Sequence, residues 1–255
     1  MDDHDSTLVA LATYNERESL PPLVDEILRH APDVHVLVVD DNSPDGTGQW
    51  CDERAKADAR LHCLHRPGKL GLGTATLDAF RYSLAHNYTY VVMMDADFSH
   101  HPRYLPALRA AMNPGPGERV DVAIGSRYVP GGGTEGWPLR RRWMSRGVNL
   151  YARLLLGLTP RDCSGAFRCY RTETLRQVPL DRVRSRGYSF QEEILWHLKR
   201  AGARFEEIPI VFTDRRLGQS KINLGEAWAA LRIILMLGVR NGLRPRTPSG
   251  NRAAP

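Results

Sequence analysis

The sequence predicts an open α/β fold in which a mostly parallel sheet is flanked by helices. Short, β-branched and almost continuously apolar runs, as at residues 8–11 and 34–39, are typical of strands buried on both faces of a parallel sheet. Segments with helical spacing separate these runs, and the alternation repeats four times along the first half of the chain. This alternation indicates right-handed βαβ units, which build an open sheet covered by helices.

The elements of the first half follow from these patterns in chain order. Pro102 suits the first turn of the last helix in this half, because proline lacks an N–H that the first turn would leave unsatisfied. Strands are expected at residues 8–11, 34–39, 61–64 (the weakest), 90–94 and 120–124, and helices at 16–29, 47–59, 74–85 and 102–112.

From Tyr128 onward the sequence pattern changes from alternating strands and helices to a helix-rich second half. A glycine-rich loop around residues 131–136 is of the kind that carries function or moves. We expect one domain over residues 1–240, with halves 7–128 and 129–240. The second half is expected to contain helices at 143–156, 190–201 and 224–240, a strand at 204–212, and after them a disordered basic tail at 241–255.

The charge balance indicates a partner that bears phosphate. The 255 residues include 35 Lys and Arg against 29 Asp and Glu, a net charge of +6, and 42% are hydrophobic, as in an ordinary globular protein. Excess cations suit nucleic acid, an anionic membrane or phosphorylated small molecules. Nucleic acid is disfavoured, because the basic residues are not arrayed with aromatic ones in any recognised binding module.

Three features restrict where the protein acts. The most apolar stretch, residues 233–239, is closed by Arg232 and Arg240, so it falls short of the ~18 apolar residues of a spanning helix. The acidic residues 1–5 are unlike a signal peptide, and a cytoplasmic protein is therefore expected. The four cysteines contain no C-x-x-C pair and are expected to be reduced packing residues.

Acidic residues follow the expected strands at the edge of the sheet where ligands bind in open α/β folds. Asp95 and Asp97 follow the strand at 90–94, and two carboxylates suit Mg²⁺ or Mn²⁺ holding a diphosphate, although paired aspartates also serve as turn caps. Asp41 either accepts hydrogen bonds from a base or ribose, or belongs to an ordinary turn and helix cap at 42–46.

The histidines that follow these acids leave two interpretations. His100 and His101 are either metal ligands or residues that start the next helix, and a metal that holds diphosphate prefers oxygen. The segment Gly71-Leu72-Gly73 lacks the third glycine of the dinucleotide fingerprint, which excludes a nicotinamide dehydrogenase. With Arg66 and Lys69 upstream, it suits the edge of a nucleotide pocket instead.

A glycine-centred basic loop precedes the last helix. Residues 214–221 present Arg215 and Lys221, whose fork and point charge suit phosphate. A solvated basic turn is the alternative.

Together these motifs resemble those of the family 2 glycosyltransferases, and more narrowly those of the polyprenol monophosphate (dolichol-phosphate) mannose synthases. The similarity runs in order from about residue 7 to residue 240, and the strings at 40–47 and 95–102 are the most specific. The motifs are Thr13-Tyr14-Asn15-Glu16, Val39-Asp40-Asp41-Asn42-Ser43-Pro44-Asp45-Gly46-Thr47, Lys69-x-Gly71-Leu72-Gly73, Asp95-Ala96-Asp97-x-Ser99-His100-His101-Pro102, Gly125-Ser126-Arg127-Tyr128, Asp162-Cys163-Ser164-Gly165-Ala166-Phe167-Arg168-Cys169-Tyr170 and Gly218-x-Ser220-Lys221.

The resemblance implies a GT-A fold and an inverting transfer of mannose from GDP-mannose to a polyprenyl phosphate, assisted by Mg²⁺ or Mn²⁺. Residues 7–128 would hold the nucleotide sugar and residues 129–240 would face the acceptor. One alternative is the same reaction with another nucleotide sugar such as UDP-glucose. A non-catalytic nucleotide-binding protein is disfavoured, because the metal-site acids and the basic residues are all present.

The resemblance also implies roles for individual residues. Ala12 stands where relatives usually have proline, so only a backbone contact is expected there. Asp97 corresponds to the metal carboxylate, and Ser99 stands where some relatives place a glutamine ligand. The matching positions are Ala12, Tyr14, Glu16, Val39 and Asp41 for the nucleotide, Asp95, Ala96 and Asp97 for the sugar nucleotide and metal, and Arg127, Arg215 and Lys221 for the donor and acceptor phosphates.

The implied acceptor explains which catalytic groups the site needs. A phosphate monoester, with a second pKa of about 6, is already an anionic nucleophile at neutral pH. No general base is required, and Glu193 in the segment Gln191-Glu192-Glu193 is therefore expected to be structural or to orient the site. The site must instead neutralise the departing diphosphate and hold two phosphate groups together.

A polyprenyl substrate calls for a membrane surface. Leu224, Trp228, Leu231 and Leu235 share one helical face, which suits an interfacial helix and suits a buried core helix equally well. The basic run at 139–146 suits anionic headgroups, or else an ordinary solvated helix start. Some relatives carry transmembrane segments that this chain lacks, so the resemblance implies peripheral attachment to the cytoplasmic face of a membrane, or dependence on a membrane-anchoring partner.

Overall fold

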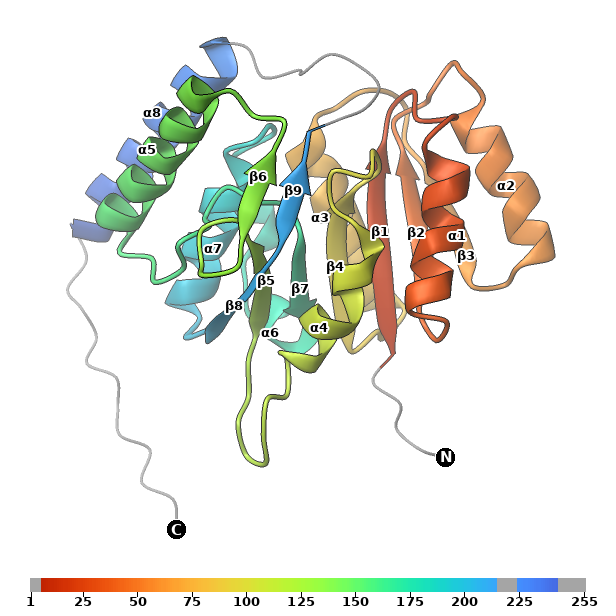
Figure 1. Cartoon of the computed structure of the whole chain (residues 1–255), viewed down its shortest axis with the longest axis horizontal. Helices are drawn as coiled ribbons and strands as arrows, with labels where there is room; N and C mark the ends of the chain where they lie inside the picture. Colours follow the sequence, from red (N-terminus) through yellow and green to blue (C-terminus); the bar gives the residue numbers. More distant parts are fainter. Residues whose placement is uncertain (1–5, 215–223, 243–255) are drawn as a thin grey trace.

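The computed structural model describes residues 6–214 and 224–242, and within the last helix the side chains of residues 231–240. A seven-stranded sheet with the order β3-β2-β1-β4-β7-β5-β8 lies at its centre (Figure 1). Neighbouring strands are parallel except β7, which is antiparallel to both β4 and β5. The strands are β1 Thr7–Thr13, β2 His35–Asp40, β3 Leu61–His65, β4 Tyr90–Asp95, β5 Val122–Ser126, β7 Arg168–Arg171 and β8 Phe205–Pro209.

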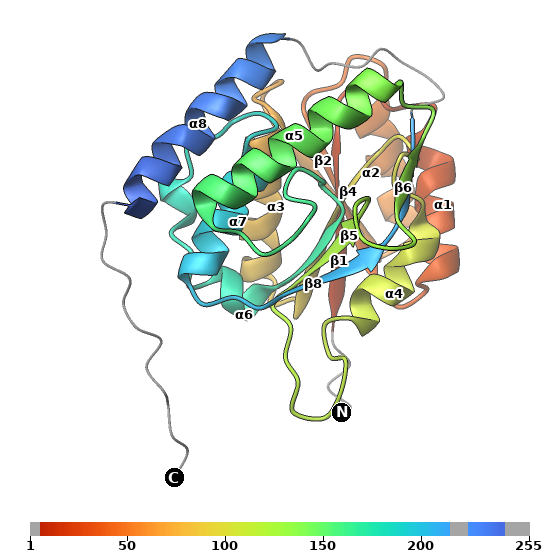
Figure 2. The same ribbon diagram turned by 60° about the vertical axis from the view of Figure 1, so that its left-hand side comes forward.

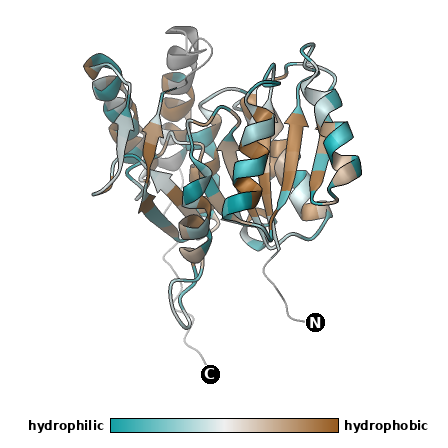
Figure 3. Ribbon diagram, turned by 45° about the vertical axis from the view of Figure 1, so that its right-hand side comes forward, coloured by the Kyte–Doolittle hydropathy of each residue, from teal (hydrophilic) through white to brown (hydrophobic). Residues whose placement is uncertain are grey.

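Helices cover both faces of this sheet, which confirms the predicted α/β fold. Successive strand residues point to opposite faces, so the apolar runs supply two cores: Leu8 and Leu37 face one, and Val9 and Val38 the other. Figure 3 shows the apolar residues concentrated in the strands between the helices. The helices are α1 Leu20–His30, α2 Thr47–Ala57 and α4 Leu105–Ala110 on one core, α3 Leu72–Ala85, α5 Leu139–Leu156, α7 Phe190–Arg200 and α8 Leu224–Gly242 on the other, and the short α6 Thr172–Leu175 (Figures 1 and 2).

The first helix begins four residues later than predicted, at Leu20 and not at residue 16. Residues before it form a turn bound to the loop after β2, because the backbone N–H groups of Asn15 and Glu16 donate to Ser43 Oγ (3.0 Å) and Thr47 Oγ1 (3.1 Å). Prolines in the first turn of α1 are compatible with a start there and not with a helix that runs through them. The turn ties the ends of β1 and β2 together.

The second half departs further from the prediction. The strand expected at 204–212 is two strands, because β8 ends at Pro209, which cannot donate a ladder hydrogen bond. The second piece, β9 Val211–Thr213, pairs with β6 Gly133–Glu135, which lies inside the expected loop. α5 begins four residues before the predicted start at 143, and β7 was not predicted. Most of the predicted tail, residues 243–255, lies outside the described residues.

Candidate active site

The carboxyl ends of three adjacent strands bring predicted donor-site residues together. In the sheet register, Ala12 on β1 lies opposite Val39 on β2 and opposite Asp95 on β4. Tyr14 and Asp41 lie immediately beyond the ends of β1 and β2. The positions predicted to contact the nucleotide and the first carboxylate predicted to bind metal therefore share one edge of the sheet.

Two consecutive aspartates at the end of β2 have different roles. Asp40 is buried, and its carboxylate accepts hydrogen bonds from Thr13 Oγ1 (3.0 Å) and Ser43 N (2.9 Å), so it builds the turn. Asp41 forms a buried salt bridge with Arg66. Burial raises the pKa of Asp41, and the attraction of Arg66 only partly offsets that effect. Arg66 therefore orients the acid at the edge of the expected nucleotide pocket.

Residues from two loops contact each other at this edge of the sheet. The Lys69 ammonium lies 4.5 Å from the ring centroid of Tyr14, a distance at which the cation and the ring attract each other. The carboxylate of Glu16 accepts a hydrogen bond from Ser19 Oγ (2.8 Å). Tyr14 thus contacts the loop that precedes α3, whereas Glu16 is held by Ser19 in the turn before α1.

Asp97, the second acid predicted to bind metal, is held by Ser99, which was also predicted as a ligand. Asp97 Oδ1 accepts hydrogen bonds from the backbone N (3.0 Å) and from Oγ (2.5 Å) of Ser99. Ser99 is buried, and its hydroxyl is directed at the carboxylate. This geometry gives Ser99 an orienting role, while its predicted role as a ligand remains a prediction.

Of the two histidines after Asp97, His101 matches the helix-start interpretation. Its Nδ1 accepts a hydrogen bond from the backbone N of Arg103 (3.1 Å), as a cap does. His100 is fully enclosed, burial lowers its pKa, and its Nδ1 accepts a hydrogen bond from the backbone N of Asp95 (3.2 Å). The His100 ring therefore helps to build the turn that carries Asp95 and Asp97, and the His101 ring caps the short helix that follows it.

Two glycines let the start of α3 contact the backbone of the loop before α7. A Cβ on Gly73 would lie 2.5 Å from Ser185 O, and one on Gly71 would lie 2.5 Å from Arg186 O. The backbone N of Gly73 also donates to Arg186 O (2.8 Å). Only glycine permits this approach at the edge of the expected nucleotide pocket.

We expect Gly73→Ala to lower the free energy of unfolding by about 1–3 kcal/mol, because an added methyl group must displace backbone. Gly68→Ala is the matched control, since no atom lies within 4 Å of a Cβ there, and its effect should stay within about 0.5 kcal/mol. Urea unfolding followed by circular dichroism measures both values. Equal effects for the two variants would contradict the steric explanation.

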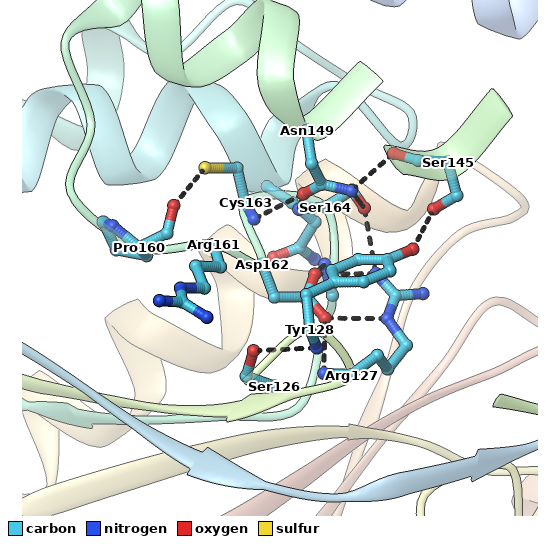
Figure 4. Close-up of polar contacts among 12 residues, drawn as sticks. Ser126, Arg127, Tyr128, Ser145, Asn149, Pro160, Arg161, Asp162, Cys163 and Ser164 are labelled. Atoms are coloured by element: carbon cyan, nitrogen blue, oxygen red, sulfur yellow. Dashed lines mark hydrogen bonds and ion pairs between the residues drawn. The ribbon is translucent and has the colours of Figure 1, made fainter. Parts of the chain in front are cut away.

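Arg127 follows β5 and forms a buried, bidentate ion pair (Figure 4). Its Nε and Nη2 donate to the two carboxylate oxygens of Asp162, each at 2.7 Å, and its backbone N donates to the same carboxylate at 3.0 Å. Burial alone would raise the pKa of Asp162, but the attraction and hydrogen bonds of Arg127 hold it below its ordinary value. Both groups are therefore charged at neutral pH.

Asn149 connects this ion pair to α5 (Figure 4). Its Oδ1 accepts hydrogen bonds from the backbone N of Cys163 (2.6 Å) and of Ser164 (3.1 Å), and its Nδ2 donates to Ser164 Oγ (3.0 Å). Ser164 Oγ in turn accepts a hydrogen bond from Arg127 Nη2 (2.9 Å). The network fixes α5 against the loop that follows it.

A cleft of about 620 Å³ lies between α5 and the loop after β5. Arg127 is one of the residues that line this cleft, and its side-chain hydrogen bonds to the described residues use Nε and Nη2. The phosphate-binding role of Arg127 remains a prediction. The cleft is lined by Arg127, Tyr128, Val129, Pro130, Gly132, Arg146, Asn149, Leu150, Arg153 and Arg161.

The acids at the start of α7 are not placed as general bases. Glu193 accepts hydrogen bonds from the backbone N of Arg184 (3.1 Å) and of Ser185 (2.8 Å). Burial alone would raise its pKa, but His197 and these bonds together lower it. Glu193 thus fixes the loop that contacts Gly73, in agreement with the orienting role expected for it. Glu192 is fully buried, and burial raises its pKa to about 7.

Glu192 predicts a pH-dependent stability difference. The raised pKa means that the folded state favours the neutral acid. The contribution of Glu192 to the free energy of unfolding is therefore fully present below pH 4.5 and is lost as the pH rises through about 7. Gln is neutral at every pH. We therefore expect Glu192→Gln to be more stable than the parent protein by ~1–3 kcal/mol at about pH 8, and by much less at about pH 5. Urea titrations at both pH values test this, and a difference that does not change with pH would contradict it.

Two of the predicted phosphate-binding residues, Arg215 and Lys221, lie outside the described residues. In the other direction, Asp162, Asn149 and Ser164 were not assigned a role from the sequence, although the string that starts at Asp162 was noted as a motif. The sequence signal for this loop was an acid, a serine and a glycine within four residues. The ion-pair role of Asp162 could not be found from it, because the partner Arg127 is 35 residues away.

Comparison with known proteins identifies the family. Residues 8–178 match the family described as Glycosyl transferase family 2. The chain belongs to this glycosyltransferase family. It is 45% identical over 238 residues to the polyprenol monophosphomannose synthase of Mycolicibacterium smegmatis, covering 93% of this chain and 88% of that protein. It is 43% identical to the undecaprenyl-phosphate mannosyltransferase of Micrococcus luteus, covering 94% of this chain and 98% of the relative.

Solved structures confirm the GT-A fold of this glycosyltransferase. Glucosyl-3-phosphoglycerate synthase from Mycobacterium tuberculosis, solved with Mn²⁺, UDP and glucosyl-3-phosphoglycerate, superposes with a TM-score of 0.65 over 95% of this chain and 82% of that one. The two sequences are 20% identical, so the likeness concerns the fold alone.

Proposed function

We propose that this glycosyltransferase moves mannose, with inversion, from GDP-mannose to a polyprenyl phosphate, assisted by Mg²⁺ or Mn²⁺. The observation that carries the proposal is the 43–45% identity, over more than nine-tenths of this chain, to two proteins named for mannosyl transfer to polyprenyl phosphates. In this proposal residues 7–128 bind the donor and residues 129–240 face the acceptor.

The residues at the end of β4 fit a hard divalent cation. Asp97 offers a carboxylate oriented by Ser99, and Asp95 offers a second that is 26% exposed. Oxygen donors of this kind bind Mg²⁺ or Mn²⁺ through one or two carboxylates together with phosphate oxygens. The ion would neutralise the charge that develops on the departing diphosphate. The presence of Mn²⁺ together with UDP in the structurally similar glucosyl-3-phosphoglycerate synthase supports a divalent cation in this proposal.

The surrounding acids support an acceptor that needs no general base. Glu193 is occupied by backbone amides and Glu192 is buried, so neither is positioned to remove a proton from an incoming hydroxyl. A phosphate acceptor is already anionic near neutral pH. The chemical task that remains is to hold two phosphate groups together, which we assign to Arg127, Arg215 and Lys221.

The donor is tested by competition. Purified protein, a short polyprenyl phosphate, Mn²⁺ and radiolabelled GDP-mannose should yield labelled lipid, and EDTA should abolish the product. Excess unlabelled GDP-mannose should suppress the signal, whereas excess UDP-glucose should not. Product with UDP-glucose and none with GDP-mannose would overturn the donor assignment while leaving the lipid acceptor in place.

We also propose that α5 and α8 contact the membrane that carries the acceptor. None of the described helices is long and apolar enough to span a bilayer. Of the eight large hydrophobic side chains exposed among the described residues, seven lie on these two helices, which pack side by side (Figure 2). A concentrated apolar surface with basic neighbours is typical of a helix at a membrane interface. The seven are Leu139, Trp143, Met144, Leu150, Leu154, Leu235 and Val239.

The paired variant Trp143→Ala and Leu154→Ser should weaken binding to anionic vesicles by roughly 10-fold or more, because each side chain would otherwise bury apolar surface in the lipid. Leu70→Ser is the control, since Leu70 is the eighth exposed hydrophobic and belongs to the loop before α3 and to neither helix. Co-sedimentation with phosphatidylglycerol vesicles measures the change. Equal losses for both variants would contradict a membrane face on α5 and α8.

A further inference from the structure

A cluster of metal-binding side chains lies at the open edge of the sheet, outside the candidate active site. Cys63 and His65 are two residues apart on β3 and therefore share one face of this edge strand. Helix α2 covers that face and contributes Asp52. Within the described part of the chain, this is the single place where three such donors converge, with the ligand atoms all within 4.8 Å of one another.

The geometry of the cluster leaves it open to an ion from solvent. Asp52 Oδ1 and His65 Nε2 are 2.9 Å apart, and each side chain is 50% exposed. Cys63 is half-buried behind them. A fourth coordination position would face water, as in zinc sites that have three protein ligands.

A second cysteine packs beside the cluster. Cys51 on α2 is buried, and its Sγ donates a hydrogen bond to the backbone O of His62 (3.7 Å), the residue before Cys63. The thiol that the cluster offers to a metal is therefore that of Cys63, and Cys51 is a buried neighbour and not a ligand.

We propose that Asp52, Cys63 and His65 form a binding site for a thiophilic divalent cation, with Zn²⁺ as the ion that suits this donor set. Thiolate and imidazole favour Zn²⁺, whereas Mg²⁺ and Mn²⁺ prefer all-oxygen sites. The site is thus chemically distinct from the carboxylates at the end of β4. It is close to the donor edge nevertheless, because His65 lies opposite Asp40 in the sheet register and the next residue, Arg66, pairs with Asp41.

Cobalt is the probe that reports the ligands directly. Reduced, chelator-treated protein in excess Mg²⁺ is titrated with Co²⁺, and one equivalent should produce a near-ultraviolet thiolate-to-cobalt charge-transfer band that Zn²⁺ then removes. Cys63→Ser should abolish the band. His65→Gln should retain it but weaken affinity by at least about 10-fold, the lower end of what loss of an outer-shell partner costs. Circular dichroism confirms that each variant is folded.

Two control variants test whether the band arises from this cluster. His86→Gln removes an exposed histidine outside the cluster and should leave the titration unchanged. Asp97→Ala should also leave the charge-transfer band intact, because the active-site carboxylate is not part of the site. A Co²⁺ spectrum without the thiolate band, or a band that survives Cys63→Ser, would overturn the proposal whether or not the protein transfers mannose.

Discussion

Replacing Asp97 with alanine is expected to slow mannosyl transfer by at least about 1000-fold, which corresponds to ~4 kcal/mol of transition-state stabilisation. Asp97 is the carboxylate proposed to hold Mg²⁺ or Mn²⁺ at the donor diphosphate, and such an ion supplies several kcal/mol by stabilising charge on the leaving group. Initial rates of labelled-lipid formation measure the loss. Because the ligand itself is removed, added Mn²⁺ should restore little of the rate.

Ser99→Ala tests a smaller change at the same place, because it removes a group that orients Asp97 and leaves the carboxylate itself. Ser99 holds Asp97 Oδ1 through its hydroxyl and its backbone N–H, and alanine removes only the first of these bonds. A loss of about 10-fold is expected, of the size typical for partners that orient a ligand, and raised Mn²⁺ should partly restore it. Asp181→Ala, at a side chain that is 92% exposed, should match the parent protein. A folded Asp97→Ala protein with activity within tenfold of the parent would exclude Asp97 as the metal carboxylate.

The parts of the fold that the sequence predicted are those governed by local patterns. Continuous apolar runs such as Val36 to Val39 must be buried on both faces, and this requirement alone predicts a parallel sheet with helices on each side. β7 was not predicted because its four residues include two arginines, and its antiparallel position between β4 and β5 is set by pairing with distant strands. Likewise, β6 becomes a strand only because β9 lies beside it.

In the candidate site too, residues marked by a local pattern could be predicted from the sequence, and contacts between distant residues could not. Asp95, Asp97 and Asp41 could be predicted because each follows an apolar strand at the edge where ligands bind. Pairing between distant residues could not be predicted: Arg66 reaches Asp41 across 25 residues, and Arg127 reaches Asp162 across 35. From the sequence alone, Arg127 could be interpreted only as a cation available to phosphate. In the fold, two of its three side-chain nitrogens already donate hydrogen bonds to Asp162.

Because Arg127 and Asp162 form a buried ion pair, we expect Asp162→Ala to lower the free energy of unfolding by a large amount. The variant would leave Arg127, whose side chain is 8% exposed, without its carboxylate, and breaking a buried pair by removing one partner costs about 3–5 kcal/mol. The carboxylate also accepts hydrogen bonds from the backbone N–H groups of Arg127 (3.0 Å) and Gly165 (2.9 Å). For a chain of this size the melting temperature should fall by roughly 6–20 °C, measurable by calorimetry and by urea unfolding.

Comparison with an exposed pair isolates burial as the cause. Arg109 also forms two hydrogen bonds to one aspartate, at 2.8 and 2.6 Å, but that partner, Asp33, is 61% exposed. Asp33→Ala should therefore cost less than about 1 kcal/mol. Adding Arg127→Leu to an Asp162→Leu protein should recover part of the lost stability, since no unpaired charge remains, but should not recover transfer activity if Arg127 also meets phosphate. Recovery of both would limit Arg127 to a structural role, and equal costs for Asp162→Ala and Asp33→Ala would contradict the argument from burial.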